Sequence, residues 1–212
     1  MTIMLLCGTL FALAGCVSTA APQPAATPRP TIPPTPTVPV NNYADIILWP
    51  ADLPSGFEPL SSEDSFFDVT QSLPGATLES RFSFVRKDRN PELITGSTMR
   101  VADPANRSAI DLVLNDPEEL LATIASGLPQ QVVSKQTLSN LARLGDASAG
   151  ISITYLEGQD RWTMDMTLFR EDEAVVFIAM AYRENDLPPL PLSAFAYKLA
   201  DRAKRLTAAP GG

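Results

Sequence analysis

The chain has 212 residues, 45% of them hydrophobic, and a net charge of −8 at neutral pH. So acidic a chain does not suit nucleic acid or electrostatic docking on anionic lipid, since both need a basic surface. It contains no histidine, which excludes Ser-His-Asp and Cys-His catalysis and any zinc, copper or haem site built on imidazole.

A short apolar segment near the N-terminus ends at a cysteine. Residues 3–14 are almost wholly apolar, but the segment is too short for a membrane-spanning helix, which needs about 20 residues. Its length is typical of the apolar part of a secretory signal peptide. The small residues Ala14 and Gly15 directly precede Cys16, which is the pattern that a signal peptidase requires.

The segment Leu13-Ala14-Gly15-Cys16 resembles the lipobox of bacterial lipoproteins. The resemblance implies a signal peptide over 1–15 and a diacylated Cys16 as the mature N-terminus; two acyl chains anchor a protein stably where one binds only marginally. Cys7 would leave with the signal peptide, so we expect no disulfide. The first two residues carry no Lys or Arg, so either the natural start lies upstream or this start is marginal. The alternatives are an ordinary secretory signal and an uncleaved anchor.

Residues 16–40 are predicted to be the lipidated cysteine and a tether rich in proline and threonine. Prolines recur there every one to four residues from Pro22 to Pro39, which excludes helix and sheet and favours an extended polyproline II chain. At about 3.1 Å per residue, twenty such residues reach roughly 60 Å. A proline-rich ligand for another domain is the alternative.

The globular domain is predicted over 41–207, followed by a flexible tail at 208–212. This part carries every acidic residue and every basic residue except Arg29. The apolar segment 43–49 is predicted to be a helix that Pro50 stops, with a turn over 52–57. Alternation predicts a strand over 78–86, with Phe82 and Phe84 on one face, and 96–102 as its partner. Whether 108–114 is a strand or a helix entry stays open.

Asp116 and Pro117 mark a helix start, because Asp caps a helix and Pro suits its first turn. This helix is predicted to end at Gly127 and Pro129, and its buried positions are Leu120, Leu121, Ile124 and Leu128. The segment 131–144 is predicted to be a strand that runs into a turn at Gly145.

Three further segments, 151–155, 162–168 and 174–182, are predicted to form an antiparallel meander. The last is apolar throughout, as expected of a central strand covered on both faces. In the second, Trp162, Met164, Met166 and Leu168 share one face and are predicted to be core. A final helix is predicted over 192–207, with a basic cluster near its C-terminal end, where the helix dipole favours cations. The predicted fold class is α+β, an antiparallel sheet with helices packed on it.

The turn Asp52-Leu53-Pro54-Ser55-Gly56-Phe57, the later Gly-Asp turn and the closing helix together resemble exported PsbP-like and PknH-sensor-like lipoprotein modules. The resemblance implies a binding or sensing domain without a catalytic centre. We therefore expect no enzyme activity, no cofactor and no metal site.

The candidate ligand groove is the polar stripe Thr163, Asp165 and Thr167, whose alternative is a plain solvent-facing strand surface. Carboxylates gather at 63–68, 118–119 and 171–173, and their predicted role is charged surface: a loop, a helix start and a hairpin tip. The predicted function is thus a membrane-anchored extracytoplasmic lipoprotein with a non-catalytic binding, sensing or scaffold domain, whose partner is a protein or a small molecule and not nucleic acid. A carrier of an apolar ligand and a hydrolase that uses carboxylates alone are the alternatives.

Overall fold

The computed structural model describes residues 42–61, 73, 75–87, 92–127 and 130–207. These residues belong to one compact unit, Val38–Gly212. The predicted signal peptide, lipidated cysteine and tether, the acidic group at 63–68 and the C-terminal tail all lie outside the described residues. No helix within the described part is long and apolar enough to cross a membrane.

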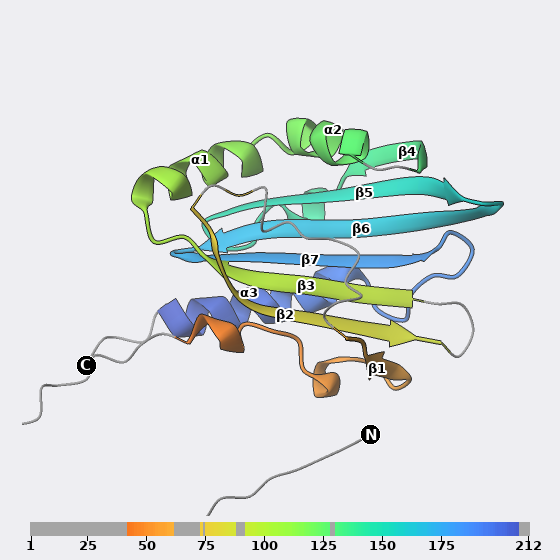
Figure 1. Cartoon of the computed structure of the whole chain (residues 1–212), viewed down its shortest axis with the longest axis horizontal. Coiled ribbons are helices and arrows are strands. Elements are labelled where there is room, and N and C mark those ends of the chain that lie inside the picture. Colours follow the sequence, from red (N-terminus) through yellow and green to blue (C-terminus); the bar gives the residue numbers. More distant parts are fainter. Residues whose placement is uncertain (1–41, 62–72, 74, 88–91, 128–129, 208–212) are drawn as a thin grey trace, which may run out of the picture. The chain divides into compact units, whose positions relative to one another are not determined.

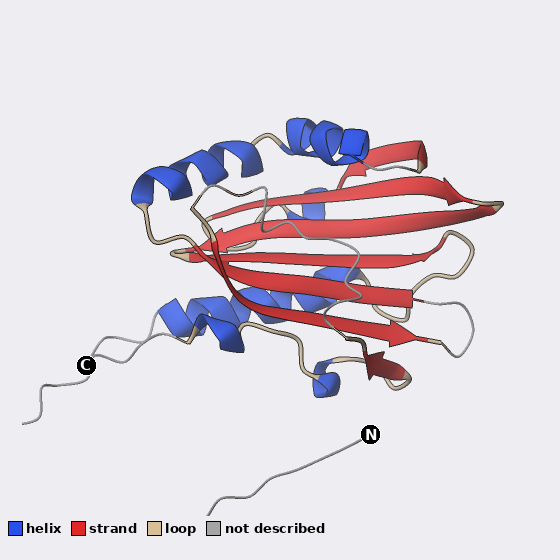
Figure 2. Cartoon of the chain, in the orientation of Figure 1, coloured by secondary structure: helices blue, strands red, loops and turns tan. Residues whose placement is uncertain are grey.

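Seven described strands form one sheet in the spatial order β1-β2-β3-β7-β6-β5-β4 (Figure 1). Each neighbouring pair is antiparallel, which confirms the predicted α+β class with an antiparallel sheet (Figure 2). The strands are β1 Phe57–Pro59, β2 Thr77–Arg86, β3 Glu92–Arg100, β4 Gln131–Thr137, β5 Ala147–Glu157, β6 Asp160–Glu171 and β7 Ala174–Arg183.

Helices pack on both faces of this sheet. The helix α3, Leu192–Thr207, lies behind the strands in Figure 1 and packs on one face, which we call the α3 face. Phe195 of this helix shares an apolar core with Val176 of β7. The helices α1, Pro104–Leu114, and α2, Pro117–Gly127, pack on the opposite face, where Ile110 shares a second core with Phe177.

The strand β7 occupies the middle of the sheet, as its apolar sequence predicts. Its alternate residues Val175 and Phe177 belong to one core, and Val176 and Ile178 to the other. Successive strand residues point to opposite faces, so a strand covered on both sides needs an unbroken apolar run. The meander of β5, β6 and β7 and the core role of the face with Trp162 and Met164 are confirmed as well.

The undecided segment 108–114 is the second half of α1. The helix α1 begins in the same way as α2, with an aspartate followed by a proline. Asp103 and Asp116 accept hydrogen bonds from main-chain N–H groups, at 2.8 Å and 3.1 Å. The helix predicted after Asp116 is confirmed to Gly127, with Leu121 fully buried. Leu128 and Pro129 lie outside the described residues.

The N-terminal part of the domain differs from its prediction. The segment 43–49 is not one helix: a 3-10 turn covers Tyr43–Asp45, and Pro50 begins a second turn rather than ending a helix. Between the two turns the chain runs extended enough to bury Ile46 and Leu48 against the sheet while Trp49 stays exposed. Burial of alternate residues therefore overrides the local helical preference.

Two strand boundaries also differ. β3 begins at Glu92, four residues before its predicted start, and pairs with β2 as expected. The segment 131–144 divides into β4 and a 3-10 turn at Ser139–Leu141, called η5. Leu138 and Leu141 of this part cover Gly150 of β5, where an added Cβ would lie 2.5 Å from Leu141 Cβ. The turn at Gly145 is confirmed, with φ of +61°.

The closing helix has its predicted bounds, Leu192–Thr207, with Phe195 and Leu199 buried. Two of its basic residues also make a long-range contact that the sequence does not indicate. Arg202 and Lys198 reach Asp52, at 2.8 Å and 3.7 Å, and join the helix to the N-terminal turns.

Candidate functional site

The predicted groove residues lie on β6 and face the same side as α3. Thr167 is 1% exposed, and its hydroxyl donates to the Ala149 carbonyl at 2.8 Å. Thr163 is 9% exposed and lies 3.3 Å, oxygen to oxygen, from Thr154. The alternative of a solvent-facing strand is therefore wrong for both threonines. Their role in a ligand groove stays a prediction.

Asp165, the third residue of the stripe, accepts a hydrogen bond at 3.0 Å from the hydroxyl of Tyr182 on β7. Burial, and then the charge of Asp165, raise the pKa of Tyr182, because both disfavour the phenolate. The phenol therefore remains a donor across the physiological pH range.

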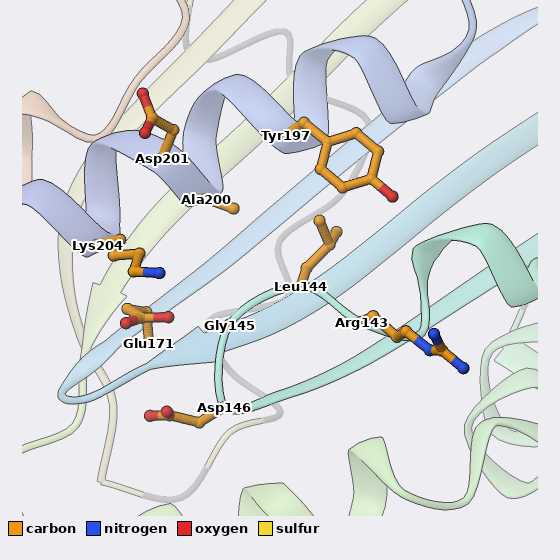
Figure 3. A pocket seen from close by; sticks show the side chains of 9 residues that line it. All are labelled: Arg143, Leu144, Gly145, Asp146, Glu171, Tyr197, Ala200, Asp201 and Lys204. Carbon is orange, nitrogen blue, oxygen red and sulfur yellow. The ribbon is translucent and has the colours of Figure 1, made fainter.

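A pocket of about 460 Å³ opens elsewhere on the α3 face, beside the second half of α3 (Figure 3). Three elements form its walls: the helix itself, the loop between η5 and β5, and the end of β6. The residues that line it are Arg143, Leu144, Gly145, Asp146, Glu171, Tyr197, Ala200, Asp201 and Lys204.

The loop of this pocket passes very close to β6 at Gly145. A Cβ on this residue would lie 2.2 Å from the Arg170 carbonyl oxygen, and its φ of +61° favours glycine. The next residue, Asp146, donates its main-chain N–H to the same carbonyl at 2.7 Å. The close passage brings Asp146 beside Glu171, the last residue of β6.

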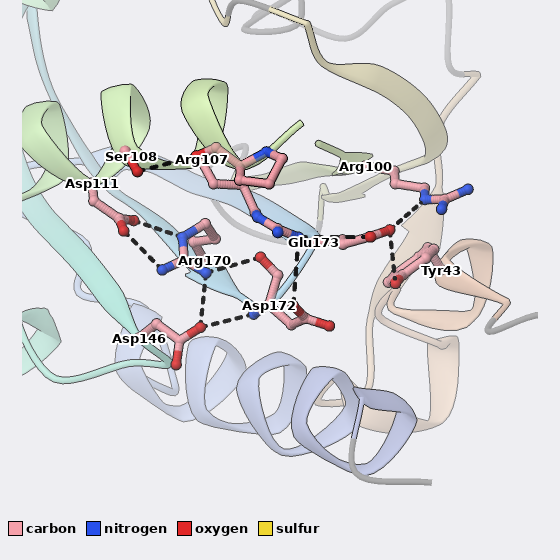
Figure 4. Close-up of polar contacts among 10 residues, drawn as sticks. Tyr43, Arg100, Arg107, Ser108, Asp111, Asp146, Arg170, Asp172 and Glu173 are labelled. Carbon is pink, nitrogen blue, oxygen red and sulfur yellow. Dashed lines mark hydrogen bonds and ion pairs between the residues drawn. The ribbon is translucent and has the colours of Figure 1, made fainter. Parts of the chain in front are cut away.

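Arg170 fixes this corner from the opposite face of β6 (Figure 4). Its guanidinium forms a two-point pair with Asp111 of α1, at 2.6 Å and 2.8 Å. It also donates to Asp146, at 2.8 Å, and to the Asp172 carbonyl, at 2.9 Å. These contacts raise the pKa of Arg170, chiefly through the hydrogen bonds that it donates to Asp111. One side chain therefore joins α1, the pocket loop and the β6–β7 turn.

The acidic residues at 171–173 form a hairpin tip, as predicted, with the Asp172 side chain 58% exposed, and ion pairs also hold this tip in place. Glu173 pairs with Arg100 at 2.8 Å and with Arg107 at 3.6 Å, and Tyr43 donates to it at 3.5 Å (Figure 4). Asp172 has a φ of +52°, which is uncommon for a residue other than glycine. Its N–H donates to Asp146 at 2.9 Å. This network holds one wall of the pocket in place.

Two charges inside the pocket stand apart from this network. Glu171 and Lys204 point toward each other from β6 and α3 (Figure 3), yet neither forms an ion pair with any residue that the structure describes. Burial, and next the charge of Asp146, raise the pKa of Glu171, while Lys204 lowers it. Arg143 lies at the rim and points away from them, and Asp201 pairs with Arg205 at 2.5 Å.

The pocket was not predicted from the sequence. Its parts were each noticed for another reason: Gly145 as a turn, Glu171 in an acidic tip and Lys204 in a basic helix end. No local pattern links these three residues, because only the crossing of α3 over the end of β6 brings them together. Within the described residues, no group of three or more Cys, Asp or Glu side chains is arranged to hold a metal ion.

Comparisons with known proteins assign no family. No protein-family model matches the chain, and no curated protein matches it in sequence. Among solved structures, the chain is similar to LpqN, which is involved in cell envelope biogenesis of Mycobacterium tuberculosis. The TM-score is 0.35 and the identity 13%, over 72% of this chain and 75% of that chain. A likeness at this level supports no statement about function.

Proposed function

We propose that this chain is an extracytoplasmic protein, anchored by lipid at Cys16, whose folded domain binds a small polar ligand in the pocket beside α3 and catalyses no reaction. The binding part of the proposal rests on the pocket. The anchoring part rests on the sequence.

The observation that carries the binding proposal is the contrast between Glu171 and its neighbours. The surrounding acidic side chains Asp111, Asp146 and Glu173 are all paired with arginine. Glu171 is partly buried, faces Lys204 and has no ion-pair partner among the described residues. Charged groups held partly out of water without a partner destabilise a fold, and such groups gather at functional sites. A bound ligand would supply the missing partner.

A fragment screen by nuclear magnetic resonance tests this proposal on the full-length chain in detergent. Small anions, cations, zwitterions and neutral polyols are each titrated into ¹⁵N-labelled protein. We expect at least one class to shift the amides of Gly145 and Ala200 saturably while Phe84, remote on β2, stays unchanged. If no class moves the pocket amides, the pocket is not a binding site and the proposal fails.

The lipid anchor is tested by metabolic labelling with palmitate. We expect label in the wild-type chain and none in Cys16→Ala, with the variant released from the membrane fraction. Cys7→Ala is the matched control, because Cys7 lies in the apolar segment and is no acylation site in the lipobox pattern. Equal labelling of Cys16→Ala and wild type would contradict the anchor.

The pocket favours binding of a polar ligand over the two alternatives. Charged side chains from three elements line it, and an apolar ligand would have to strip water from them at a large cost in free energy. A carboxylate hydrolase needs two carboxylates that are free to act. Asp146 is held by Arg170 and by the Asp172 N–H through its Oδ2, so among the described carboxylates that line the pocket Glu171 is the one without such a bond.

A further inference from the structure

We infer that the ligand of this pocket is a small zwitterion of the amino-acid or peptide type, with its ammonium group at Glu171 and its carboxylate at Lys204. The inference rests on the proposed function and deepens it by naming the chemical class of the ligand.

The charges that remain available in the pocket have both signs. Glu171 and Lys204 have no ion-pair partner among the described residues, whereas Asp201 is already paired with Arg205. Asp146 uses only its Oδ2 in hydrogen bonds, and its side chain is 48% exposed. Its Oδ1 can therefore accept a second bond from an ammonium group at Glu171.

A ligand of a single charge would leave one of these groups unsatisfied. A plain anion at Lys204 would lie close to Glu171, and a plain cation at Glu171 would lie close to Lys204; each would meet repulsion that weakens binding. A zwitterion gives each protein charge a partner of opposite sign, and hydrogen bonds between ionised groups are stronger than neutral ones. Complementary charge on both ends also rejects singly charged competitors.

The pocket beside the two charges has room for a short chain. Gly145 has no side chain, and the position where its Cβ would lie is 3.1 Å from Glu171 Oε2, so the carboxylate lies directly against the loop. Leu144 and Ala200 add an apolar surface to the pocket beside the two charged side chains (Figure 3). The volume of about 460 Å³ falls within the usual range for small-molecule sites.

Isothermal titration calorimetry on the full-length chain in detergent tests the inference with matched probes. Glycylglycine carries both charges, N-acetylglycylglycine only the anion and glycylglycinamide only the cation. We expect glycylglycine to bind at least 10-fold more tightly than either capped form. Free glycine in the same series distinguishes the two sources of this chemistry, since tighter binding of glycine points to free amino acids and tighter binding of glycylglycine to peptides.

The variants Lys204→Met and Glu171→Gln should each weaken binding of glycylglycine at least 10-fold. Lys135→Met and Glu157→Gln are matched controls on exposed strand positions outside the pocket, and they should leave the affinity unchanged. Circular dichroism confirms that each variant is folded.

Three results would overturn the inference. Binding of glycylglycinamide as tight as that of glycylglycine would make the pocket a cation site, and equal binding of the acetylated form would make it an anion site; the proposed function survives both. If none of these probes binds, the zwitterion class is excluded, and the fragment screen alone decides whether the pocket binds any ligand.

Discussion

Replacement of the Arg170 guanidinium is the substitution that most directly tests how the pocket corner is held. Its guanidinium makes four hydrogen bonds, three of them to the carboxylates of Asp111 and Asp146, and the side chain is 12% exposed. Breaking a fully buried ion pair costs about 3–5 kcal/mol. The two carboxylates are 29% and 48% exposed, so water can solvate them in the variant. We therefore expect Arg170→Met to lower the free energy of unfolding by about 2–3 kcal/mol.

Urea denaturation of the full-length chain in detergent, followed by tryptophan fluorescence, measures this change. With a urea dependence of about 2 kcal/mol per M, the midpoint should fall by roughly 1 M. Arg161→Met on the same strand is the matched control, because the Arg161 side chain pairs with Glu184 at 3.4 Å and both side chains are well exposed. That variant should lose less than about 1 kcal/mol. Equal losses in the two variants would refute the idea that Arg170 ties the corner together.

Three further substitutions test the packing of the domain. Burial raises the pKa of Asp52, but the hydrogen bonds and charge of Arg202 and the Trp49 N–H outweigh it and leave the pKa lowered; a lowered pKa stabilises the fold above the unfolded value. Asp52→Asn should therefore lower the free energy of unfolding by about 1–2 kcal/mol at pH 7. Urea denaturation should show this difference from the wild type shrinking as the pH falls below 3.8. A difference that persists at pH 2 would contradict this. Gly96→Ala should cost at least about 2 kcal/mol, since its Cβ would lie 2.3 Å from Phe82 Cζ and 2.6 Å from a main-chain oxygen of β7. Gly158→Ala, with nothing within 4 Å of the added Cβ but a φ of +66°, should cost about 1 kcal/mol in the same urea denaturation. A larger loss for Gly158→Ala than for Gly96→Ala would show that the crowding at Gly96 is relieved.

The elements with a strong local signal could be predicted from the sequence. Alternation located β2 and β6, an unbroken apolar run located β7, and the apolar stripe around Phe195 and Leu199 located α3. α1 was missed although Asp103 and Pro104 carry the capping signal that located α2. The apolar content of 108–114 is compatible with a strand as well as a helix, and it left this segment undecided.

Features that depend on tertiary contacts could not be predicted. The segment 43–49 looks helical locally, but burial of Ile46 and Leu48 against the sheet decides its path. Likewise, no spacing in the sequence indicates that Lys204 would come to face Glu171, since 33 positions separate them and the approach depends on how α3 crosses β6. Sequence patterns report faces and ends of elements, whereas a pocket between elements depends on their packing.

The most direct test of the account is a crystal structure of the full-length chain grown with and without glycylglycine. The account predicts a ligand that bridges Glu171 and Lys204, with its ammonium toward the carboxylate and its carboxylate toward the lysine. A pocket that holds only water in both crystals, with Lys204 paired directly to Glu171, would contradict it.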